Sequence, residues 1–89
     1  MFLQKEKTLL GMLQLKEYER FWELSSFVMN PTVQGQGYGR AMLSQVLETV
    51  DSPVCLRVKQ GNPAQRLYES LGFQTEGVGD GRYYMKYLK

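Results

Sequence analysis

Hydrophobic and polar residues alternate along residues 21–29 with the period of two that is typical of β-strands. Residues 9–18 mix aliphatic and polar residues and also predict a strand, and the polar stretch 4–7 between two apolar pieces predicts a hairpin turn. Asn30-Pro31 ends the second strand, because proline has no amide hydrogen for the ladder. Strict alternation in that strand predicts two faces: Trp22, Leu24, Ser26 and Val28 on one, Phe21, Glu23, Ser25, Phe27 and Met29 on the other.

The rest of the chain predicts two helices and three more strands. One helical face is formed by Met42, Leu43, Val46, Leu47 and Val50. Residues 54–58 are β-rich, and Asn62-Pro63 predicts the start of a helix that runs to about Ser70. The segments 73–76 and 82–88 predict a closing hairpin. The order β-β-β-α-β-α-β-β predicts one α+β domain, residues 1–89, with a mixed sheet in which a right-handed crossover joins parallel strands at 21–29 and 54–58.

Composition excludes several classes of protein. The 89 residues include no histidine and one cysteine, which excludes histidine-dependent nucleophilic centres, histidine-based zinc sites and an internal disulfide. A net charge of +2 gives no electrostatic reason for a nucleic-acid partner. No apolar run approaches the length of a membrane span, and the N-terminus is charged too early for a secretory signal. We therefore expect a cytoplasmic protein without metal or membrane contact.

Three glycines at alternate positions, Gly35, Gly37 and Gly39, lie between a predicted strand and a predicted helix. Such a loop can point the amides of residues 35–40 at one anion, with help from the helix N-terminus. The spacing fits neither the dinucleotide fingerprint nor the Walker loop, since the third glycine comes one residue early and no Lys-Ser/Thr pair follows. An ordinary flexible connection is the alternative interpretation.

Two motifs carry a resemblance to the GNAT superfamily of N-acetyltransferases. Gln34-x-x-Gly37-x-Gly39 resembles its acetyl-coenzyme A loop, and residues 62–73, NPAQRLYESLGF, resemble its second cofactor segment. Their order and separation make the resemblance specific over about residues 9–88. It implies a GNAT-like mixed sheet, acetyl-CoA as co-substrate, and direct acetyl transfer to the primary amine of a small molecule or peptide. A non-catalytic coenzyme A-binding or protein-interaction module is the alternative function.

Members of that superfamily usually have an additional N-terminal strand and two helices that form one wall of the acceptor site. This chain begins at about the second strand. Three explanations stay open: a compact member, a partner subunit that supplies the wall, or a fragment of a longer product. A shortened sheet also leaves an uncovered edge strand, so we expect a possible homodimer.

The resemblance implies a set of cofactor-binding residues. The amides of residues 35–40 would hold the pyrophosphate, and the strand near 27–29 would bind the pantetheine arm. For Asn62, a helix-capping role is as good an explanation as cofactor binding. For Arg40, the alternative is a solvated position in the first turn of the helix. The full set is Phe27, Val28, Met29, Gln34, Gly35, Gln36, Gly37, Tyr38, Gly39, Arg40, Asn62 and Tyr68.

Two residues are candidates for the chemistry. Tyr68 matches the family tyrosine that protonates the departing thiolate. A phenol with a pKa of about 10 can protonate a thiolate whose thiol has a pKa of about 8.5. Glu23 is the candidate base for the amine; sharing a face with Phe27 would partly desolvate its carboxyl and raise the pKa. The alternative for Tyr68 is an aromatic ring that only packs on the sheet, and the alternative for Glu23 is a surface carboxylate. Cys55 is expected in the core.

Overall fold

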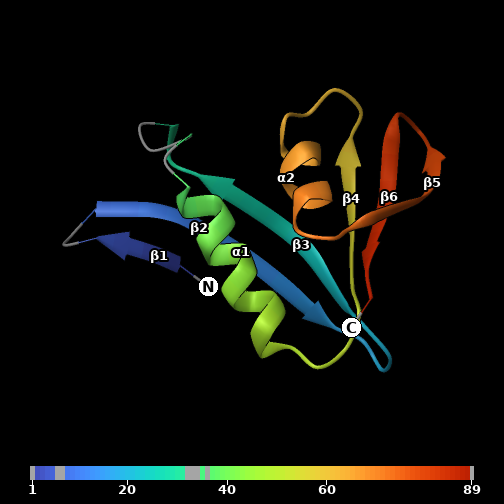
Figure 1. Cartoon of the computed structure of the whole chain (residues 1–89), viewed down its shortest axis with the longest axis horizontal. Helices are drawn as coiled ribbons and strands as arrows, with labels where there is room; N and C mark the ends of the chain where they lie inside the picture. The colour runs from blue at the N-terminus through green and yellow to red at the C-terminus, as the bar shows by residue number, and fades with distance from the viewer. Residues whose placement is uncertain (1, 6–7, 32–34, 36, 89) are drawn as a thin grey trace.

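The structure of the chain is a computed structural model that describes residues 2–5, 8–31, 35 and 37–88. It confirms the predicted order of elements (Figure 1). These are β1 (Phe2–Lys5), β2 (Thr8–Glu17), β3 (Trp22–Met29), α1 (Tyr38–Thr49), β4 (Val54–Lys59), α2 (Ala64–Ser70), β5 (Gln74–Gly79) and β6 (Arg82–Tyr87). Of the predicted first turn, Gln4 and Lys5 belong to β1, and residues 6 and 7 lie outside the described residues.

The strands form one six-stranded sheet in the order β1-β2-β3-β4-β6-β5. All neighbours are antiparallel except β3 and β4, which are parallel and joined through α1, as the sequence predicts. The fold is therefore the predicted mixed α+β architecture. Within the described ranges, neither helix is long and apolar enough to cross a bilayer.

Both helices pack on the same face of the sheet, which we call the helix face (Figure 1). The core lies between them and the sheet, and consists of Leu13, Leu24, Met42, Leu43, Val46, Leu47, Val54, Leu56, Val58, Tyr68, Phe73 and Met85. On β4, Val54, Leu56 and Val58 are buried, whereas the intervening residues are more exposed. Alternation therefore puts Cys55 on the opposite, open face, where it is half-buried, so its expected place in the core is wrong.

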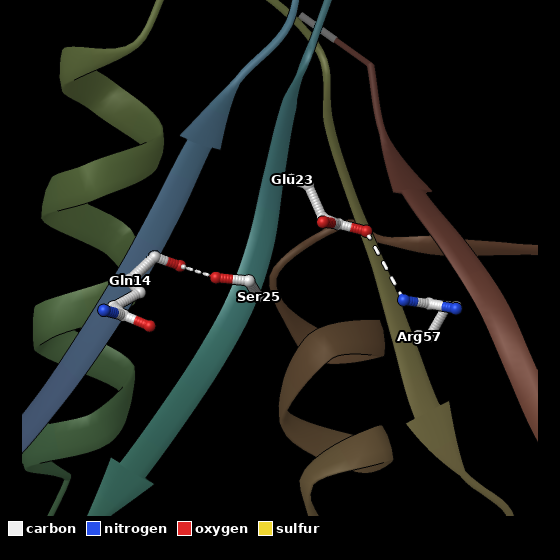
Figure 2. A network of polar contacts seen from close by, with 4 residues as sticks. All are labelled: Gln14, Glu23, Ser25 and Arg57. Carbon is white, nitrogen blue, oxygen red and sulfur yellow. Dashed lines mark hydrogen bonds and ion pairs between the residues drawn. The ribbon is translucent and has the colours of Figure 1, made fainter.

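A β-bulge at Ser25 changes the side-chain phase of β3. Leu15 pairs with Leu24, but Gln14 pairs with Ser26, so Ser25 is the additional residue, and its hydroxyl donates to the Gln14 carbonyl at 3.3 Å (Figure 2). Leu24 lies in the core, and Phe27 and Met29 also pack against it, while Val28 is exposed. The predicted strict alternation along 21–29 is therefore wrong beyond Ser25.

Candidate functional site

The two parallel strands separate and leave a fork in the middle of the sheet. β3 and β4 pair only at Trp22–Val54 and Glu23–Cys55, although β3 continues to Met29 and β4 to Lys59. Beyond Glu23, the backbone groups of β3 that face β4 have no partner strand. An extended ligand can bind such an edge through main-chain hydrogen bonds, without special side chains.

The start of α1 presents backbone amides beside this fork. The first three amides of the helix, from Tyr38 to Arg40, lie beyond the reach of intrahelical carbonyls, and the Ala41 amide is the first to bond back, to the Gly37 carbonyl at 3.1 Å. Gly37 offers no side-chain cap, and the first turn has no acidic residue. These amides and the helix dipole are therefore available to an anion.

Glycine is favoured in this loop for two physical reasons. Gly35 and Gly37 have φ values of +85° and +83°, a left-handed conformation that other residues adopt only with strain. Gly39 has a normal conformation, but a Cβ atom there would lie 3.3 Å from Phe27 Cζ and 3.4 Å from Met29 Cγ. Its missing side chain lets α1 approach β3. The predicted residues Gln34 and Gln36 lie outside the described residues.

A cleft of about 630 Å³ lies between the glycine loop, β3 and α2. It brings together many of the predicted cofactor residues, which come from segments up to 41 positions apart, as Phe27 and Tyr68 are. Sequence reasoning did not assign Pro63, Ala64 and Leu67 to the site, although all three lie within the second motif, residues 62–73. The complete lining is Phe27, Val28, Met29, Gly35, Gly37, Gly39, Arg40, Asn62, Pro63, Ala64, Leu67 and Tyr68.

Tyr68 projects from α2 into this cleft with a buried ring. Its side chain is 7% exposed and packs between Phe27 and Phe73, with ring centroids at 6.3 and 5.7 Å. No described residue forms a hydrogen bond with the Tyr68 hydroxyl. Among the described residues, no fully buried side-chain oxygen lacks a hydrogen-bond partner, so the hydroxyl oxygen must be accessible from outside, and it reaches the cleft that Tyr68 lines. Burial raises the pKa of the Tyr68 phenol. The group is thus a protonated donor at neutral pH.

The polar contacts of Asn62 and Arg40 stabilise the walls of the cleft. Asn62 Oδ1 accepts a hydrogen bond from the Ala64 amide at 2.9 Å, the capping contact that the sequence suggested. Arg40 reaches across to α2, where its guanidinium donates to Ser70 Oγ at 2.5 Å. Ser70 Oγ in turn donates to the Leu67 carbonyl at 2.7 Å. The two helix segments that line the cleft are therefore joined, and a direct role of either side chain on a ligand stays a prediction.

Glu23 lies on the open face and not with the cleft residues. The bulge moves Phe27 to the helix face, so the expected shared environment of Glu23 and Phe27 is wrong. The Glu23 carboxylate instead faces the Arg57 guanidinium at 3.9 Å, with 23% of its side chain exposed (Figure 2). Glu23 and Tyr68 therefore approach the fork from opposite faces of the sheet. No cluster of metal-ligating side chains occurs in the part of the chain that the structure describes.

Comparison with known proteins agrees with this architecture. The family model of the acetyltransferase (GNAT) family matches residues 1–73. The chain belongs to this family. A search of the curated proteins found no match.

Solved structures with the same fold include several N-acetyltransferases. PaiA N-acetyltransferase of Thermoplasma acidophilum, solved with coenzyme A, is 20% identical, with a TM-score of 0.85 over 97% of this chain and 57% of that protein. The ribosomal-protein-S18-alanine N-acetyltransferase of Escherichia coli is 23% identical, with a TM-score of 0.84 over 98% of this chain and 68% of that one. A spermidine N-acetyltransferase SpeG chimera from Vibrio cholerae is 27% identical, with a TM-score of 0.75 over 93% of this chain and 60% of that protein. The chain thus spans less than two thirds of the first and third proteins.

Proposed function

We propose that this chain binds acetyl-CoA in the cleft and transfers the acetyl group directly to a primary amine. The observation that carries the proposal is the common cleft of the glycine-loop amides, the unpaired edge of β3 and the Tyr68 hydroxyl. The amides from Gly37 to Arg40 are suited to the diphosphate, and the backbone of Phe27–Met29 is suited to the pantetheine arm. A β3 amide near the fork would also stabilise the oxyanion of the tetrahedral intermediate.

The proposed reaction needs one proton acceptor and one proton donor. The amine nitrogen forms a bond to the acetyl carbon, and the carbon–sulfur bond then breaks. A lysine-like ammonium must first lose a proton, which costs about 4.6 kcal/mol at pH 7 from a pKa of 10.4. Glu23 would accept that proton, through water, and Tyr68 would give its phenolic proton to the departing thiolate. The nitrogen loses a second proton as the amide forms, and this proton would return through water to the Tyr68 phenolate. Burial makes the phenol a weaker acid, but a thiolate held beside the same buried ring would also be disfavoured as a charged group.

Titration of the purified chain with acetyl-CoA tests the cofactor site. We expect calorimetric binding in the micromolar range, and no binding at hundreds of micromolar would refute both the site and the activity. Thiol release with a panel of primary amines then separates an enzyme from a binding module. We expect turnover that Glu23→Gln lowers about a hundredfold. Binding without turnover on any amine would favour the non-catalytic module.

An uncovered sheet edge supports the further proposal of self-association. β1 and β5 are the outer strands, and Val78 on β5 is 61% exposed. We expect a homodimer in sedimentation velocity that Val78→Lys weakens, because a charge on an edge strand opposes strand pairing. A monomer at every concentration tested would contradict this expectation.

A further inference from the structure

A second hollow lies on the open face of the sheet, around the same fork but away from the cleft. Its volume is about 380 Å³. The lining comes from β2, β3, β4 and β6 and consists of Lys16, Glu23, Leu24, Ser25, Arg57, Lys59 and Arg82. Four of these side chains are basic and one is acidic, so the hollow carries a surplus of three positive charges. The net charge of the whole chain, only +2, gives no indication that positive charge is concentrated in this hollow.

The protein offsets these charges only in part, because its one acidic residue in the hollow, Glu23, pairs with Lys16 across β2 and β3 and lies near Arg57. Lys59 on β4 pairs directly with Arg82 on β6, and like charges in that arrangement repel each other. The Glu23 carboxylate is 3.9 Å from Arg57. Among the described residues, no carboxylate lies within ion-pair distance of Lys16, Lys59 or Arg82. An anion from outside the chain would offset this repulsion.

The position of the hollow connects it to acetyl transfer. Glu23, the candidate base, lines it at the point where β3 and β4 cease to pair. Positive charge around this point repels an ammonium ion and favours the neutral amine, which is the form that attacks the thioester. A substrate with a second cationic group would be repelled as well, whereas one with an anionic group would be attracted.

We propose that the acceptor is a primary amine that also carries an anionic group, a carboxylate or a phosphate. The anionic group binds Lys59 and Arg82, and the amine lies beside Glu23. Lys59 is four residues along β4 from Cys55, the partner of Glu23, a separation of about 13 Å at 3.3 Å per residue. An amine with a chain of about five carbons, together with the flexible lysine and arginine side chains, spans this distance. The inference rests on the proposed function and adds the class of acceptor to it.

A series of amines of equal length tests this inference. The probes are 5-aminopentanoate, 5-aminopentanamide and 1,5-diaminopentane, whose far ends are negative, neutral and positive, and 4-aminobutyl phosphate. We expect kcat/KM for thiol release to fall in the order anion, amide, diamine, with roughly tenfold between the first and the last. High salt should reduce this difference. The carboxylate and the phosphate compounds show which anion the hollow prefers.

Variants of the hollow show whether its charges cause the preference. Lys59→Gln with Arg82→Gln should reduce the advantage of the anion to about threefold or less, and Lys59→Glu with Arg82→Glu should make the diamine the better substrate. Arg66→Gln, on the exposed side of α2, removes a cation outside both hollows and serves as the matched control. The glutamine variants remove a repulsion, so their melting temperature should not fall.

A binding measurement keeps the test independent of turnover. With coenzyme A-saturated protein, 5-aminopentanoate should shift the backbone NMR signals of β4 and β6, and the diamine should not. Equal shifts or rates for anion and diamine, or no binding of either anionic amine, would overturn the inference and leave the cofactor site intact. Failure of coenzyme A itself to bind would instead overturn the proposed function.

Discussion

Replacing Tyr68 by phenylalanine is expected to lower kcat for acetyl transfer by about a hundredfold and to leave coenzyme A affinity within about threefold of the original. A general acid contributes roughly 10²–10⁴-fold to rate, and this substitution removes only the hydroxyl. The ring, with its contacts to Phe27 and Phe73, is kept, so the core and the cleft wall are preserved. Steady-state thiol release and calorimetry measure the two quantities.

The pH dependence of the rate separates proton donation from packing. Because burial raises the pKa of Tyr68, the phenol keeps its proton at neutral pH and loses it only above its ordinary value of about 10. In the pH–rate profile of the original chain, the rate should therefore fall at high pH, and the profile of Tyr68→Phe should lack this fall. Tyr87→Phe is the matched control, because it removes the hydroxyl of another tyrosine whose ring packs at a tilt against Phe73, outside the cleft. An unchanged kcat in Tyr68→Phe would exclude this residue as the acid.

Replacing Gly37 by valine is expected to weaken coenzyme A binding by about thirtyfold or more. Gly37 has φ +83°, where an L-residue is strained by about 1–2 kcal/mol and a β-branched residue by more. A shift toward negative φ would rotate the loop amides away from the diphosphate, and about 1.4 kcal/mol corresponds to tenfold in affinity. Calorimetric titration with coenzyme A measures the loss.

Gly81→Val is the matched control for Gly37→Val. Gly81 has φ +73°, and a Cβ atom added at either glycine would meet no other atom within 4 Å, but Gly81 lies in the β5–β6 turn outside the cleft. Both variants should lose similar thermal stability, and only Gly37→Val should lose coenzyme A binding. Equal affinities in the two variants would mean that the loop amides do not hold the ligand.

Local patterns predict most of the architecture because they follow from local chemistry. The spacing of apolar residues from Met42 to Val50 marks the buried face of α1, and Asn62-Pro63 marks the start of α2 through the capping contact that the structure contains. Glycines at 35 and 37 indicate positive φ, which both residues have. The motif that includes Tyr68 identifies the residue whose hydroxyl reaches the cleft.

The bulge at Ser25 is not predictable in this way. A bulge depends on how β3 pairs with β2, so the sequence of β3 alone does not reveal that the alternation changes phase there. The place of Cys55, by contrast, follows from the alternation of β4, because Cys55 shares a face with the charged Arg57 and that face is the open one. The bulge in β3 also places Glu23 and Phe27 on different faces of the sheet, which the sequence does not predict.

By itself, the sequence determined the order of elements, the family resemblance and the glycine loop, since each depends on residues close together along the chain. Only the tertiary structure decided which distant residues share a surface. Strand pairing places Lys59 opposite Arg82 and collects positive charge around Glu23, although the chain as a whole carries a net charge of only +2. Surface charge depends on the sheet register and on which face the helices cover, and neither is encoded in a local pattern.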